Sequence, residues 1–159
     1  MGLDMYLNAE RYLWSSSDGP NSKIKAAIQE MMPETAGMEV QTVSVEALYW
    51  RKANAIHKWF VDTLQDGVDE CQTTRVNWDS LVELRALCQR VLDDNSIAPD
   101  VLPAGSGFFF GNTEYNDWYF KDLERTVEGI NRIEKQLVTE ETEDGERYSQ
   151  WDFFYSSSW

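Results

Sequence analysis

The chain has 159 residues, of which 42% are hydrophobic and 13% aromatic, and it carries a formal net charge of −14. This apolar content is sufficient for the core of one domain, so we predict a folded single domain over residues 1–159. The acidity argues against direct nucleic-acid binding and against an anionic membrane surface, because both require clustered Lys and Arg. It suits a partner with a basic face, or it serves only to keep the protein in solution.

Cysteine and histidine are scarce. Cys71, Cys88 and His57 are too few for a disulfide scaffold or a structural zinc site, so we expect no metal and no cofactor. No apolar run approaches the roughly 20 residues that span a bilayer, and the N-terminal residues lack the basic and apolar segments of a signal peptide. We therefore expect a cytoplasmic protein.

The N-terminal segment is predicted to begin with a strand. Leu3, Met5 and Leu7 recur with a period of two, which indicates a strand with one buried face. The composition beyond this strand favours a loop, then a short helix that stops before Pro33. In chain order we predict a strand over 3–13, a loop over 15–22, a helix over 23–32 and a loop over 33–38.

The next segment is predicted to form a strand over 40–45 and a long helix from about 46 to 65. Ser44 is the expected cap of this helix. Its core face is predicted from helical spacing, and a neighbouring stripe also contains apolar residues. The core face comprises Tyr49, Ala53, Ile56 and Phe60, and the neighbouring stripe comprises Trp50, Asn54, His57 and Val61.

The second half is predicted to contain two further helices. Asn77 is placed to cap a helix over 78–93, and an amphipathic pattern predicts another helix over 116–137. The fold class we predict is α+β, with three or four helices packed on a small, mostly antiparallel sheet. The remaining predictions are a strand over 71–76, a loop over 95–107, a buried strand over 108–110, an acidic turn over 140–145 and a strand over 148–155.

The most informative stretch is the basic and aromatic block over residues 49–60. Residues 51–58 contain three cations and no acid, although the chain as a whole is strongly acidic. Arg51 or Lys52 could hold a phosphate while Trp50 stacks on a base. The alternative is that the cations pair with surrounding acids and that Trp50 and Trp59 are simply buried.

His57 and the cysteines allow several interpretations. His57 is most often expected in a core or interface, donating a hydrogen bond to a carbonyl group. It could also bind an anionic ligand, or act as a general base with Cys71 as the nucleophile. Cys88 lies on an apolar stripe and is predicted to be core.

A glycine-rich stretch over residues 102–115 is the second candidate site. Gly107 and its neighbouring glycines would let backbone amides approach a ligand, and Asn112 and Tyr115 precede a helix N-terminus that can bind anions. The stretch matches neither a Walker A loop nor a dinucleotide-binding fingerprint. Turns around a buried strand explain the same glycines.

Acidic residues are the third feature. The carboxylates show no EF-hand spacing, and charge runs are usually solvated faces. The acidic segment over 140–146 could mimic a phosphate backbone, although an ordinary solubilising turn explains it equally well.

Three stretches resemble a family of short uncharacterised bacteriophage and prophage proteins. They are Gly2-Leu3-Asp4-Met5-Tyr6-Leu7, the block over 49–60, and Gly107-Phe108-Phe109-Phe110-Gly111, within a similarity over most of residues 1–137. The family pattern has Asp-Cys-Gly where this chain has Glu70-Cys71-Gln72. Some members carry the label phosphoglycerate kinase, which this chain is too short to be. The resemblance implies a phage accessory protein of the anti-defence type in a bacterial cytoplasm.

We therefore expect a non-catalytic protein that sequesters a small anionic ligand, with a nucleotide immune signal as the leading candidate. On one helix, residues 50, 51 and 52 point in successive directions, so a shared pocket would need a homo-oligomer. The alternative is an acidic protein inhibitor or DNA mimic that docks on a host defence protein, such as a CRISPR or restriction effector. An enzyme is the third hypothesis. The predicted ligand-binding residues are Trp50, Arg51, Lys52, Asn54, His57, Lys58, Gly107, Asn112 and Tyr115.

Overall fold

The computed structural model describes residues 2–14 and 19–159 and confirms the predicted α+β class. Four strands form one antiparallel sheet in the order β2-β1-β6-β3, and β4 and β5 form a separate hairpin. The strands are β1 (Asp4–Tyr12), β2 (Thr42–Arg51), β3 (Thr74–Val76), β4 (Glu140–Glu141), β5 (Arg147–Tyr148) and β6 (Asp152–Ser158). The helices are α1 (Pro20–Met31), α2 (Asn54–Leu64), α3 (Trp78–Asp93), α4 (Ala98–Val101) and α5 (Asp117–Leu137), with 3₁₀ turns at Pro33–Thr35 and Asn95–Ile97.

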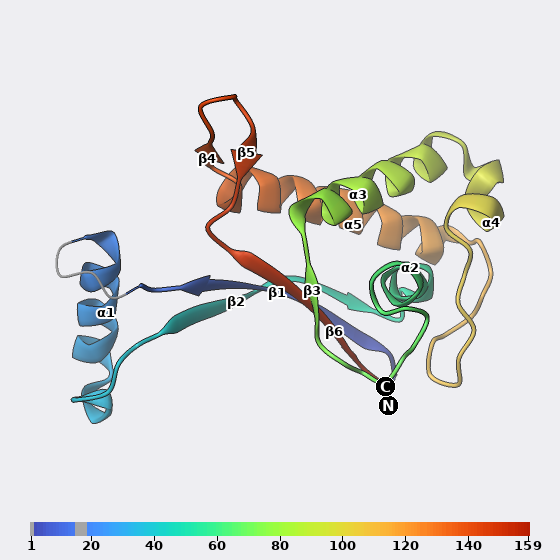
Figure 1. Ribbon diagram of the computed structural model, residues 1–159. Coiled ribbons are helices and arrows are strands. Elements are labelled where there is room, and N and C mark those ends of the chain that lie inside the picture. The colour runs from blue at the N-terminus through green and yellow to red at the C-terminus, as the bar shows by residue number, and fades with distance from the viewer. Residues whose placement is uncertain (1, 15–18) are drawn as a thin grey trace.

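One face of the sheet carries the core. Met5 lies opposite Trp50 on β2 and Ser157 on β6, and all three side chains are buried. The period of two along β1, predicted from the sequence, therefore holds. Helices α3 and α5 pack together above this face and α2 closes one end of it (Figure 1). The other face of the sheet is more open to solvent.

The hairpin of β1 and β2 extends beyond the helices, and α1 lies at its far end (Figure 1). No residue of α1 is buried. The predicted loop over 15–22 is wrong from Pro20 onward, because Pro20 opens α1, a position that suits its fixed φ. Residues 15–18 of that predicted loop lie outside the described residues.

Both predicted long helices of the second half are confirmed at their N-termini. The Asn77 side chain accepts a hydrogen bond from the Ser80 amide at 2.7 Å, and α3 begins at Trp78. Asn116 likewise accepts from the Trp118 and Tyr119 amides before α5. Caps of this kind satisfy amides that have no partner within the helix.

Two predicted elements are wrong. The helix predicted from residue 46 is strand β2 up to Arg51, and the helix begins only at Asn54. Alternating burial of Leu48 and Trp50 shows why a strand fits this segment better. The predicted buried strand at 108–110 is a turn, in which the Phe108 side chain is 95% exposed.

The shorter segments agree more closely with prediction. β3 covers the second half of the strand predicted over 71–76, and β6 overlaps the strand predicted over 148–155. The acidic turn over 140–145 joins β4 to β5. The predicted loop over 95–107 contains the second 3₁₀ turn and the short helix α4. Along residues 2–14 and 19–159 no helix is long and apolar enough to cross a membrane.

Candidate ligand-binding cleft

A cleft of about 490 Å³ lies where the end of β2 meets α2, beside the loop over 111–116 and the first turns of α5. We call it the corner cleft. Its volume is in the range of about 300–1,000 Å³ that is usual for small-molecule sites. Three cations and two carboxylates line it, in a chain whose net charge is −14. The charged residues are Arg51, Lys52, Glu114, Asp122 and Arg125.

The corner itself is built by a change of backbone direction at Lys52. Lys52 has a left-handed φ of 59°, and its amide donates to the Leu3 carbonyl at 2.7 Å. This turn directs the chain from strand β2 into helix α2 within two residues. The stem of Lys52 lies against Gly111, where an added Cβ would be 3.6 Å from the Lys52 Cβ. No described residue forms an ion pair with the Lys52 amine, so it is available to an anion.

Asn54 joins the loop to the corner. Its side-chain amide donates to the carbonyls of Phe110 and Asn112 at 3.1 and 2.8 Å, and its oxygen accepts from the Gly105 amide at 3.2 Å. The residue is only 6% exposed. Asn54 therefore holds the cleft wall in place, and its polar groups are already occupied.

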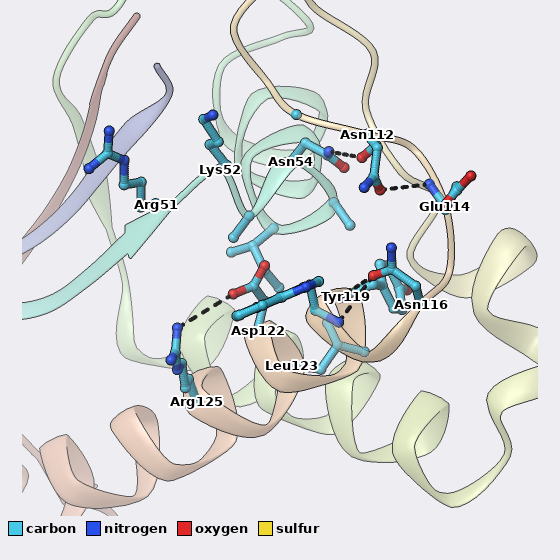
Figure 2. A pocket seen from close by; sticks show the side chains of 15 residues that line it. Arg51, Lys52, Asn54, Asn112, Glu114, Asn116, Tyr119, Asp122, Leu123 and Arg125 are labelled. Atoms are coloured by element: carbon cyan, nitrogen blue, oxygen red, sulfur yellow. Dashed lines mark hydrogen bonds and ion pairs between the residues drawn. The ribbon is translucent and has the colours of Figure 1, made fainter. Parts of the chain in front are cut away.

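Asp122 is a carboxylate that lines the corner cleft next to Arg125 (Figure 2). Its side chain is 21% exposed, and the closest cation is the Arg125 guanidinium at 4.0 Å. No described residue donates a hydrogen bond to its carboxylate. Burial raises the pKa of Asp122 to about 6, against the smaller opposing effect of Arg125. Carboxyl groups perturbed in this way are frequent in functional sites.

Three cleft residues lie along one face of α5. Trp118, Asp122 and Arg125 follow one another at spacings of four and three residues, so they are neighbours on the helix surface. The indole of Trp118 is 67% exposed, and the Lys121 amine lies 5.0 Å from its ring centroid. The face therefore presents an aromatic surface, an acceptor and a cation in sequence.

The structure corrects the roles predicted for Trp50 and Arg51. Trp50 is 3% exposed and its indole nitrogen donates to the Thr126 hydroxyl at 2.8 Å, so it cannot stack on a ligand. The Arg51 guanidinium is turned away from Asp122 (Figure 2) and lies 4.0 Å from the Asp4 carboxylate. Trp50 and Arg51 are adjacent on β2, so their side chains face opposite sides of the sheet.

His57 and Lys58 lie outside the corner cleft, beside a smaller hollow of about 260 Å³. His57 is 1% exposed, with Asp69 at 2.8 Å from Nε2 and the Tyr155 hydroxyl at 2.7 Å from Nδ1. In the neutral imidazole, Nε2–H donates to the Asp69 carboxylate and Nδ1 accepts from the Tyr155 hydroxyl. His57 is thus a core histidine as expected, although its partners are two side chains and not a carbonyl. Lys58 pairs with Asp62 at 2.6 Å.

The remaining predicted residues divide between the two sides of the loop. Asn112 lines the corner cleft, and its side-chain oxygen accepts from the Glu114 amide at 3.2 Å. Gly107 lies outside it, where a Cβ would be 2.5 Å from the Phe110 ring. Tyr115 also lies outside it and accepts from the Ala104 amide at 3.3 Å. These two residues shape the loop and do not reach the cleft.

The structure therefore brings together Lys52, Asn54 and Asn112 from the predicted set, with Arg51 at the edge. The sequence prediction missed Trp118, Asp122 and Arg125. Their helical spacing was visible in the sequence, but it lies beside a stronger apolar stripe. The anion site expected at the α5 N-terminus stays a prediction; there the Asn116 side chain accepts from the Trp118 and Tyr119 amides.

Among the described residues, no group of three or more His, Cys, Asp and Glu side chains could hold a metal ion. Comparison with known protein families, with curated proteins and with solved structures finds no match to the chain.

Proposed function

We propose that the protein binds a small anionic ligand of nucleotide size in the corner cleft and acts by sequestering it. The observation that carries this proposal is the combination of an unpaired Lys52 amine, an exposed indole and a desolvated carboxylate around one cleft of about 490 Å³. Lys52 would meet the phosphate and Trp118 would stack on the base. We propose a signal nucleotide as the natural ligand, a role that would suit the phage accessory protein implied by the resemblance.

Binding without turnover is part of the proposal. The two ring nitrogens of His57 are occupied by Asp69 and Tyr155, and the ring is buried. A general base must reach the proton that it abstracts, which this arrangement opposes. The hypothesis of a His57 and Cys71 pair therefore has little geometric support.

Native mass spectrometry with a panel of linear and cyclic nucleotides tests the proposal. We expect one intact nucleotide to be retained per site, and the same spectra report the oligomeric state. Lys52→Ala should reduce the retained fraction by at least about tenfold, which corresponds to one charge-assisted hydrogen bond. Lys135→Ala, an exposed lysine on α5 outside the cleft, is the matched control. The absence of any retained nucleotide would contradict the proposal, and a chemically altered nucleotide would favour an enzyme.

A second candidate function is docking on a basic protein, as an inhibitor or DNA mimic. The observation that favours it is the β4–β5 hairpin, which projects from the body of the molecule (Figure 1) and exposes acidic side chains. Replacing Glu143 and Asp144 by their amides would weaken such a complex and leave ligand binding in the cleft unchanged. Binding through the hairpin should also weaken steeply with salt, because exposed charges are screened.

A further inference from the structure

Asp122 limits which ligands the corner cleft can accept. Its carboxylate has two oxygens that only accept hydrogen bonds when ionised. The group is mostly buried, its nearest cation is 4.0 Å away, and no described residue donates to it. A ligand that places hydrogen-bond donors against this carboxylate would replace the water lost on burial. A ligand with an acceptor at that position would be rejected.

We propose that the corner cleft is selective for guanine nucleotides, with Asp122 accepting hydrogen bonds from N1–H and the N2 amino group of the base. This inference rests on the proposed function, because it specifies the ligand of the same cleft. Lys52 keeps its role as the phosphate contact.

The selectivity follows from the donor pattern of the bases. Guanine presents two adjacent donors, N1–H and the N2 amino group, which match the two oxygens of one carboxylate. Adenine and cytosine each place a ring acceptor beside their amino group, so an ionised carboxylate would repel that acceptor. Uracil has one donor between two carbonyl acceptors. An ionised Asp122 therefore favours guanine, and its protonated form, which is itself a donor, would favour adenine.

Two neighbouring groups support a purine in this position. Trp118 lies one helical turn before Asp122 on α5, and its largely exposed indole can stack on the ring. The side-chain oxygen of Asn112 is held by the Glu114 amide, which leaves its NH₂ group without a partner among the described residues. That NH₂ group can donate to guanine O6.

The charged groups that face Asp122 come from all sides of the cleft. Arg125 on its own helix is the cation paired with it. The other charged residues lining the cleft are Glu114 in the loop and Lys52 and Arg51 at the end of β2, and the Arg51 guanidinium is turned toward Asp4. Burial brings the pKa of Asp122, at about 6, close to neutrality. A change of base preference between about pH 5 and pH 7.5 would therefore report on Asp122.

Isothermal titration calorimetry with 3′,5′-cyclic nucleotides tests the inference. A cyclic phosphodiester keeps a single charge across this pH range, whereas a terminal phosphate would titrate near pH 6. At about pH 7.5 we expect cyclic GMP to bind at least about tenfold more tightly than cyclic AMP. Cyclic IMP, which lacks the N2 amino group, should lie between them. At about pH 5 the preference for guanine should shrink, because protonated Asp122 no longer accepts both bonds.

Asp122→Asn should reduce the preference for cyclic GMP to within about twofold and abolish its pH dependence. Glu128→Gln, an exposed carboxylate on α5 outside the cleft, should change neither. Equal affinity for cyclic GMP and cyclic AMP, with both lost in Lys52→Ala, would overturn the guanine selectivity and leave the proposed function intact. An equal loss of all three nucleotides in Asp122→Asn would also overturn it. If no nucleotide binds, the proposed function fails as well.

Discussion

The indole of Trp50 donates a hydrogen bond to the hydroxyl of Thr126 at 2.8 Å, and this contact links the edge strand β2 to the middle of α5. The Thr126 hydroxyl in turn donates to the Asp122 carbonyl at 2.7 Å. Trp50 is therefore linked through Thr126 to the backbone of the cleft residue Asp122. The exposed Trp118 is the aromatic residue that a ligand can reach.

Replacing each of these tryptophans should separate stability from binding. Trp50→Ala should lower the free energy of unfolding by about 3–5 kcal/mol, because it removes a large buried side chain. Trp118→Ala should change it by less than about 0.5 kcal/mol, because the side chain is exposed, and should weaken nucleotide binding. Urea denaturation and calorimetry measure the two effects. Loss of binding in Trp50→Ala without loss of stability would restore a direct ligand role for Trp50.

The buried contacts of His57 should contribute to stability. Asp69→Ala leaves the Nε2–H of His57 without its acceptor, and we expect a loss of about 1–3 kcal/mol in the free energy of unfolding. The matched control is Asp62→Ala, which removes only a half-exposed ion pair with Lys58 and should change stability by less than about 1 kcal/mol. Equal effects of the two substitutions in urea denaturation would show that the histidine contacts add nothing.

Asp122 should lower the stability of the free protein at neutral pH. Burial raises its pKa from the usual 3.8 to about 6, so the folded state binds the proton more tightly than the unfolded state. The contribution of Asp122 to the free energy of unfolding is therefore fully present below about pH 4. It falls as the pH rises through about 6 and is lost above that. The full penalty is at most about 3 kcal/mol, and partial exposure reduces it.

Asp122→Asn should therefore raise the free energy of unfolding by about 1–3 kcal/mol at neutral pH. The difference from the unsubstituted chain should disappear below about pH 3, where Asp122 is protonated in both states. Thermal or urea unfolding across this pH range measures it. A constant difference at every pH would show that the ionisation of Asp122 is not its source.

The two cysteines should differ in reactivity. Cys88 is fully buried, and burial raises the pKa of its thiol to about 12, so almost no thiolate exists at neutral pH. Cys71 is only partly buried. We expect a thiol reagent to titrate Cys71 in the folded protein and Cys88 only after unfolding. Reaction of both thiols at one rate in the folded state would contradict this packing.

Much of the fold follows from local pattern in the sequence. The period of two predicts the strand beginning near Leu3, and the amphipathic pattern predicts the helix over 116–137. Pattern and capping residue agree for the helix that follows Asn77. The segment before Asn54 was misassigned because a helical pattern from Ala53 onward can be extended backward through Tyr49. Only the pairing of β2 with β1 selects a strand there, and that contact lies far away in sequence.

Local pattern in the sequence also predicts part of the candidate site. Lys52 was found because a cation stands out in an acidic chain. Asp122 could not be found, because one carboxylate among 28 acidic residues has no special signal until the fold buries it. The ligand role predicted for Trp50 is wrong because residues 46–51 form strand β2 and not a helix, and the strand turns this side chain into the core.

The most direct test of nucleotide binding in the corner cleft is an NMR titration that follows the tryptophan indole and backbone amide resonances. Trp118→Phe assigns the relevant indole signal. On addition of a cyclic nucleotide, we expect shifts of the Trp118 indole and of the amides of Gly111 and Asn112. An unchanged Trp118 indole, with shifts confined to the β4–β5 hairpin or absent altogether, would contradict the account.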